Sequence, residues 1–155
     1  MLSRRSFLIT LLSAPALLLP ADLWAQAGTF LSEEEAPRAI FPDGTSFKKL
    51  RIPSTPELRA KVRSLLGSTR PSLWEEHYTV FKAKKGEGLI GYGVIVEEIG
   101  KHRPITFIVG VRADGKVQDV AVMVYREPYG GQVRYGRFLV QYEGKTLRDP
   151  LLPYR

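Results

Sequence analysis

The chain has 155 residues, the length of one ordinary domain, and 23 Lys and Arg against 16 Asp and Glu give a net charge of +7. It has no cysteine, which excludes disulfides, iron–sulfur clusters, thiolate zinc sites, thioether-linked haem and a thiol nucleophile. Its two histidines, His77 and His102, are too few for a multi-histidine metal site within one chain. Any cofactor must therefore be held mainly by backbone amides, hydroxyl groups, aromatic faces and cations.

Residues 1–27 have the layout of an export signal, with a basic opening, an apolar run over residues 7–19 and a small-x-small ending at residues 25–27. The opening at residues 3–8, Ser-Arg-Arg-Ser-Phe-Leu, resembles the twin-arginine (Tat) consensus. The 13-residue apolar run is shorter than the roughly 20 residues of a membrane span. We therefore predict Tat export to the periplasm or another extracytoplasmic compartment, with tethering to the inner membrane if the signal is not cleaved.

Without these 27 residues, 128 of the 155 remain, enough for a single packed core. The signal contains two of the basic residues and one of the acidic ones, so the remainder has a net charge of +6. This charge is moderate. Two hairpin tips are predicted to be basic, one with Lys82, Lys84 and Lys85 and one with Lys101, His102 and Arg103. Such tips face solvent, or suit phosphate groups or anionic lipid heads better than nucleic acid. We predict no nucleic-acid partner.

Residues 28–73 are predicted to form an N-terminal, mainly helical leader region. Ser32 and Glu35 have the capping-box spacing, which predicts the start of a short helix that Pro42 must end. Residues 46–52 alternate weakly in hydropathy and predict a strand.

A second helix is predicted from Pro56 to Gly67, because Ser54 or Thr55 supplies an N-cap, Pro56 is tolerated in the first turn and Gly67 supplies a left-handed stop. Apolar residues recur at helical spacing on one side of it: Leu58, Val62, Leu65 and Leu66. Basic residues on the other side are interpreted as facing solvent: Arg59, Lys61 and Arg63.

Residues 74–155 form the second predicted unit, in which the hydrophobic period changes to two. Short gaps with turn residues join the strand-like runs, so consecutive strands must be antiparallel neighbours. The predicted strands span residues 78–83, 89–99, 105–112 and 116–126. We predict an α+β fold: an antiparallel meander of four to five strands with two to three helices packed on it, two of them on one face.

The last predicted strand is apolar on both faces, so we expect it to be covered on both sides. Simple alternation places Ala121, Met123 and Tyr125 on one face and Val122 and Val124 on the other. After this strand, a short helix is predicted through residues 138–142.

The candidate ligand-binding segment follows that strand: Tyr125, Arg126, Glu127, Pro128, Tyr129, Gly130 and Gly131. It brings ionisable side chains, an aromatic ring and accessible backbone amides to one edge of the sheet. The alternative interpretation is an ordinary strand-to-helix turn with a surface Arg/Glu pair. No nucleophile with an adjacent base is visible, so we predict no catalytic residues.

Gly91-Tyr92-Gly93 is unusual inside a strand, because glycines weaken a strand interior. It indicates a bend packed against Trp74 or Tyr142, or the close approach of a ligand. The spacing does not match a dinucleotide-binding fingerprint.

The region from Trp74 to Leu151 resembles the FMN-binding domain family, found in the G subunit of Rnf complexes, the C subunit of sodium-pumping NADH:quinone reductase and small exported relatives. Residues 39–42, Ala-Ile-Phe-Pro, and the helix from Pro56 resemble the leader of these relatives. Four segments carry the resemblance within the second unit: Gly91–Val94, Ile105–Val111, Asp114–Val117 and Val124–Val133.

The resemblance implies an exported FMN-binding electron carrier, with the Tyr125–Gly131 segment at the flavin and a membrane or periplasmic redox partner. Family members carry a Ser/Thr-Gly-Ala-Thr/Ser motif, whose last hydroxyl residue is esterified to FMN by a flavin transferase. The chain departs here, because it contains no Ser-Gly-Ala-Thr sequence and stops at Arg155. The domain is therefore expected to be incomplete at its C-terminus, to bind FMN non-covalently, or to be a flavin-free periplasmic interaction module or truncated, non-flavinylated paralogue. A flavin transferase is an expected partner only if the chain is a fragment.

Overall fold

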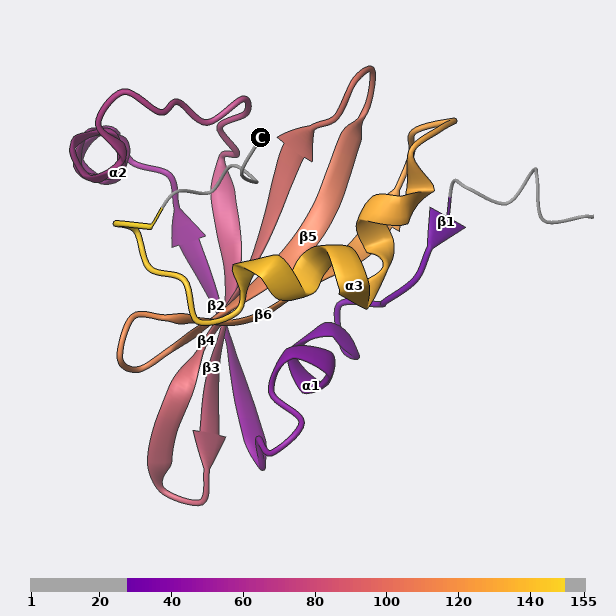
Figure 1. Cartoon of the computed structure of the whole chain (residues 1–155). Coiled ribbons are helices and arrows are strands. Elements are labelled where there is room, and N and C mark those ends of the chain that lie inside the picture. Colours follow the sequence, from indigo (N-terminus) through magenta and orange to yellow (C-terminus); the bar gives the residue numbers. More distant parts are fainter. Residues whose placement is uncertain (1–27, 150–155) are drawn as a thin grey trace, which may run out of the picture.

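The computed structural model describes residues 28–149; residues 1–27, with the predicted export signal, and residues 150–155 lie outside the described part. The described residues form one six-stranded antiparallel sheet in the order β1-β6-β5-β4-β3-β2 (Figure 1). The strands are Gly28–Thr29 (β1), Ser46–Pro53 (β2), His77–Lys85 (β3), Gly88–Ile99 (β4), Pro104–Arg112 (β5) and Val117–Tyr125 (β6). The α+β class and the meander are confirmed, and β2 forms where a weak strand is predicted; the sheet has one strand more than the predicted maximum of five because β1 adds at the edge beside β6.

The helices of the described part are short, and local sequence signals account for their ends. They are Ala36–Ile40 (α1), Pro56–Leu66 (α2) and Gly136–Leu139 (α3), with 3-10 turns at Gly131–Arg134 (η2) and Val140–Tyr142 (η3). The capping box forms, since the Ser32 N–H donates to Glu35 Oε2 at 3.0 Å and the Glu35 N–H donates to Ser32 Oγ at 3.3 Å. Thr55 caps α2 by accepting the Leu58 N–H at 3.2 Å, and Gly67 follows its end with a φ of 61°.

A β-bulge at Met123 changes the alternation that the sequence predicts for β6. Val124 pairs with Thr106 and Val122 with Phe107, so Met123 is an extra residue in this ladder. The main chain beyond the bulge is therefore out of phase, and Tyr125 packs with Val122 while Val124 packs with Met123. The prediction that placed Met123 and Tyr125 on one face was wrong, because a bulge leaves no period in the sequence.

One face of the sheet, here called the α1 face, carries the tighter core. Ile40 and Phe41 pack there with Phe81 and Ile108, and all four are almost fully buried. The glycines of β4 and β5 lie under them: a Cβ at Gly91 would be 2.7 Å from Phe41 Cζ, and one at Gly110 would overlap Ile40 Cγ2. Gly91 therefore permits close packing of the chain after α1 and does not mark a bend against Trp74 or Tyr142.

The opposite face, here called the open face, is only partly covered. Leu139 of α3 packs on it against Val122, and α2 lies over its far end without burying any side chain fully. The predicted pair of helices on one face is therefore wrong for α1 and α2, because the glycine surface that accepts α1 exists only on the α1 face. Beneath and between α2 and α3, valines of the sheet stay half-buried: Val80, Val94, Val96 and Val109.

We expect Gly110→Ala to lower the free energy of unfolding by about 1–3 kcal/mol, because the added methyl group has no room beside Ile40. Gly136→Ala is the matched control, since a Cβ there meets no atom within 4 Å. Urea unfolding followed by circular dichroism measures both. Equal stability of the two variants would contradict the packing described for α1.

Candidate functional site

Glu127, part of the predicted ligand-binding segment, is turned into the protein and caps the β4–β5 hairpin. Its Oε1 accepts the backbone N–H of His102 at 2.5 Å and that of Arg103 at 2.9 Å, and its side chain is 4% exposed. These donors hold the pKa of Glu127 below its ordinary value of 4.5. Gly100 is required beside it, because a Cβ there would lie 2.6 Å from Glu127 Oε1. The carboxylate thus links the residues after β6 to the β4–β5 hairpin by hydrogen bonds.

The rest of the segment divides between the interior and the surface. Tyr125 is buried and its hydroxyl donates to the carbonyl oxygen of Tyr129, while burial raises the pKa of Tyr125. The Tyr129 ring is 81% exposed, next to exposed Pro128 and to Gly130, whose φ of 82° favours glycine. Gly131 is buried where η2 begins. The structure therefore presents the Tyr129 ring and the turn backbone at this edge, and keeps the Tyr125 ring inside.

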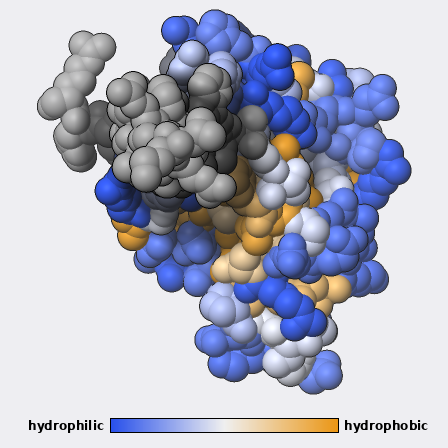
Figure 2. Space-filling view, turned by 90° about the vertical axis from the view of Figure 1, so that its right-hand side faces the viewer, coloured by the Kyte–Doolittle hydropathy of each residue, from blue (hydrophilic) through white to orange (hydrophobic). Residues whose placement is uncertain are grey.

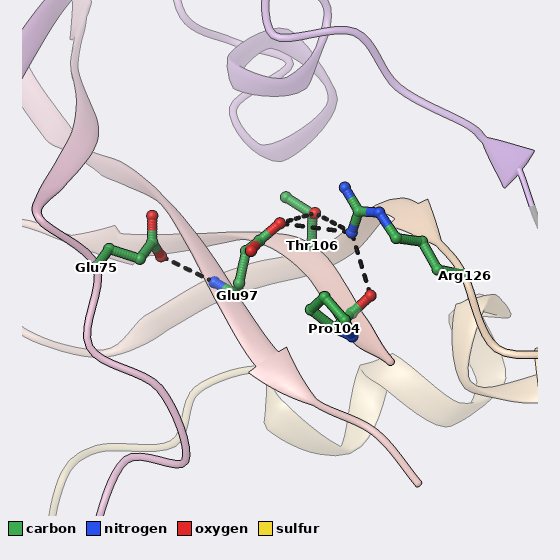
Figure 3. A network of polar contacts seen from close by, with 5 residues as sticks. All are labelled: Glu75, Glu97, Pro104, Thr106 and Arg126. Atoms are coloured by element: carbon green, nitrogen blue, oxygen red, sulfur yellow. Dashed lines mark hydrogen bonds and ion pairs between the residues drawn. The ribbon is translucent and has the colours of Figure 1, made fainter. Parts of the chain in front are cut away.

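Arg126 points away from this turn and joins a polar network that crosses the end of the sheet (Figure 3). Its Nη1 donates to Thr106 Oγ1 at 2.9 Å and to the Pro104 carbonyl at 3.1 Å, and lies 3.4 Å from Glu97 Oε1. Thr106 Oγ1 in turn donates to Glu97 Oε1 at 2.8 Å. The predicted surface pair of Arg126 with Glu127 does not form, because each side chain has a partner on the β4–β5 strands or their hairpin.

Glu75 forms the other end of the network, where its Oε1 accepts the Glu97 backbone N–H at 3.0 Å. Burial is the main cause that raises the pKa of Glu75 above 4.5, and the negative charge of Glu97 adds to it. Glu75 and Glu97 are therefore two neighbouring carboxyl groups in different surroundings, one desolvated and one paired with Arg126.

An apolar cavity of about 400 Å³ lies next to this network, between α2 and the open face of β3 and β4. Its volume is within the range of small-molecule sites. Trp74 and Tyr78 give it aromatic walls, and Glu97 and Glu98 are its acidic lining residues. Aliphatic residues complete the lining: Ile52, Leu58, Val62, Pro71, Leu73, Val80, Val94 and Val96.

Two arginines of α2 cover Trp74, which corrects the prediction that this side of the helix faces solvent alone. The guanidinium carbons of Arg59 and Arg63 lie 5.5 and 5.4 Å from the centre of the Trp74 ring. Arg59 also donates through Nε to Ser54 Oγ at 2.9 Å and through Nη2 to the Glu75 carbonyl at 3.3 Å. These contacts hold α2 above the sheet at a distance that leaves the cavity between them.

Sequence reasoning did not identify this cavity; its lining residue Glu97 pairs with Arg126 of the predicted segment. Its lining residues come from α2, β2, β3 and β4 and the loop before β3, so no local motif joins them. A usable signal was present, because Leu58 and Val62 make an apolar stripe on a helix that needs a partner surface. Without the order of strands, that surface was not assignable.

Comparison with family models, curated proteins and solved structures returned no match for this chain. Within residues 28–149, no helix has the length and apolar character that a membrane span requires.

We expect Glu127→Gln to reduce stability most at neutral pH. The folded-state pKa of Glu127 is lowered, so its ionised form stabilises the fold above the pKa of the unfolded chain, and this contribution disappears as the pH falls through the folded-state value. Wild type should therefore exceed the variant in urea midpoint at neutral pH, and the difference should shrink as the pH falls below the ordinary Glu pKa of 4.5. Glu87→Gln, at an exposed hairpin tip, is the control and should show no such pH dependence.

Proposed function

We propose that the protein is an exported FMN-binding protein that carries electrons in an extracytoplasmic redox chain. The observation that carries this proposal is the cavity between α2 and the sheet, which combines a small-molecule volume with two aromatic walls, Trp74 and Tyr78. The resemblance of the segment around Tyr125–Gly131 to FMN-binding domains supports the choice of ligand. A partner that donates or accepts the electrons, in the membrane or the periplasm, belongs to the proposal.

The residues present fit a flavin ring. The isoalloxazine is planar and largely apolar, and Trp74, Tyr78 and the valines of β3 and β4 would bind it by burial and by ring contacts. FMN supplies one- and two-electron chemistry when bound, and the protein holds the ring and sets the charge around it. Binding is proposed as non-covalent, since the 155 residues contain no Ser-Gly-Ala-Thr sequence.

Glu75 lies beside the cavity, because its chain neighbour Trp74 and its hydrogen-bond partner Glu97 both belong to the lining. Arg126 supplies a fixed positive charge beside Glu97, and Glu75 has a carboxyl group whose pKa is already raised by burial. A group with a raised pKa takes up a proton readily when nearby charge becomes more negative. Glu75 is therefore the residue proposed to hold a compensating proton when the site gains an electron.

We expect Val62→Phe to weaken FMN binding by at least about tenfold, because the added ring fills the cavity from α2. Leu65→Phe is the matched control, since Leu65 lies on the same helix and is 60% exposed. Quenching of Trp74 fluorescence and the visible absorbance of bound flavin measure the affinity. If Val62→Phe binds FMN as tightly as wild type and Tyr129→Ala does not bind it, the ring does not bind in the cavity and binds at the Tyr125–Gly131 segment instead.

The second candidate is a flavin-free periplasmic interaction module, and one exposed cluster favours it. Arg134 lies 4.7 Å from the centre of the Phe30 ring and 5.2 Å from that of Tyr135, and Arg137 lies 5.5 Å from the Tyr135 ring. Exposed aromatic residues with arginine are typical of binding hot spots. The side of the molecule that carries β1 faces the viewer in Figure 2, where hydrophobic residues form a band between hydrophilic ones.

One experiment on the purified protein distinguishes the two candidates. The protein is incubated with FMN, and unbound flavin is removed by gel filtration. A protein that is then colourless, binds its membrane redox partner, and no longer binds it when Arg134 is replaced by Ala is an interaction module. Flavin that remains with the chain through gel filtration supports the carrier.

A further inference from the structure

Two lysines face each other across β2 and β3 on the open face of the sheet. Lys48 is the register partner of Lys82, so their side chains leave the same face of an antiparallel pair. Lys84 follows two residues later on that face, and Lys82 and Lys84 are half-buried. With Ser46, these lysines line a hollow of about 340 Å³.

Lys84 has an acidic partner, Glu87, at 3.9 Å, and so do the lysines on the α1 face of the same strands. There, Lys49 pairs with Glu33, and Lys85 lies 3.7 Å from Asp43. Among residues 28–149, the side chains of Lys48 and Lys82 make no ion pair and no hydrogen bond.

Like charges directly opposite each other destabilise a sheet, and partial burial of Lys82 adds to this cost. A bound anion removes both penalties, because it neutralises the pair and supplies hydrogen-bond acceptors to both ammonium groups. Lys48 and Lys82 therefore have the properties of an anion site.

The hollow lies on the same face of the sheet as the apolar cavity. On β3, Tyr78 and Val80 line the cavity, and Lys82 is the next residue on that side. Lys82 lies four residues after Tyr78 along β3, a distance of about 13 Å. The open face thus carries an aromatic, apolar cavity and a cationic hollow in line along this strand.

We propose that Lys48 and Lys82 bind the phosphate group of the FMN whose ring occupies the cavity. This inference rests on the proposed function and adds the phosphate site to it. FMN has its parts in the same order, because its ribityl chain lies between the ring and the phosphate. On the open face of β3, Val80 likewise lies between Tyr78 and Lys82. The Tyr125–Gly131 segment is then left outside the phosphate site.

The test compares FMN with riboflavin, which has the same ring and ribityl chain but no phosphate. Affinities are measured by Trp fluorescence for three proteins: wild type, Lys48→Gln/Lys82→Gln and Lys49→Gln/Lys85→Gln. The two double variants lose the same charge from the same two strands, on opposite faces of the sheet. Thermal unfolding checks the fold, and the open-face variant should be at least as stable as wild type because a repulsion is removed.

We expect wild type and the α1-face variant to bind FMN at least about tenfold more tightly than riboflavin, and the open-face variant to bind both equally. Added salt should weaken FMN binding to wild type and leave riboflavin binding unchanged. Equal binding of FMN and riboflavin by wild type overturns the phosphate site and leaves flavin binding intact. An equal loss in the two double variants also overturns it, since the effect is then one of net charge. Binding of neither compound overturns the proposed function together with this inference.

Discussion

Close approach of α1 and Phe41 to one face of the sheet is the constraint on which the rest of the structure depends. Ile40 and Phe41 reach the backbone of β4 and β5 only because Gly91 and Gly110 have no side chains there. Burial on this face supplies the tightest part of the core and fixes the sheet between α1 and whatever covers its other side. Because the helix that fits so closely takes one face alone, the opposite face must be completed by weaker contacts.

Those weaker contacts explain why a cavity and a charged hollow occur where they do. Arg59 and Arg63 hold α2 over Trp74 by cation–π contacts and hydrogen bonds, and no side chain of α2 is fully buried. A helix attached through long polar side chains leaves space between its apolar stripe and the valines below it. Farther along the same face, no helix of residues 28–149 covers Lys48 and Lys82, so their charges remain on the same face as the apolar cavity.

The parts of this structure that were predictable are local in sequence. The capping box at Ser32, the cap at Thr55 and the short gaps between strands act within a few residues, so they set element ends and antiparallel neighbours correctly. The face taken by α1, the bulge at Met123 and the inward turn of Glu127 depend on partners far along the chain. Glu127 is predicted to contact a ligand because the neighbouring residues suit one. Its carboxylate instead accepts hydrogen bonds from backbone amides 24 and 25 residues earlier in the chain.

Charge differs between the cavity and the hollow of the open face, and this difference determines how an anionic ligand would lie across them. Glu97 and Glu98 are lining residues of the first, whereas Lys48 and Lys82 line the second. An acidic group is repelled by the first and attracted by the second, while its apolar part gains most by burial against Trp74. A ligand with one flat apolar end and one anionic end therefore has a single favourable orientation, and its ring lies next to the carboxyl group whose pKa is raised, Glu75.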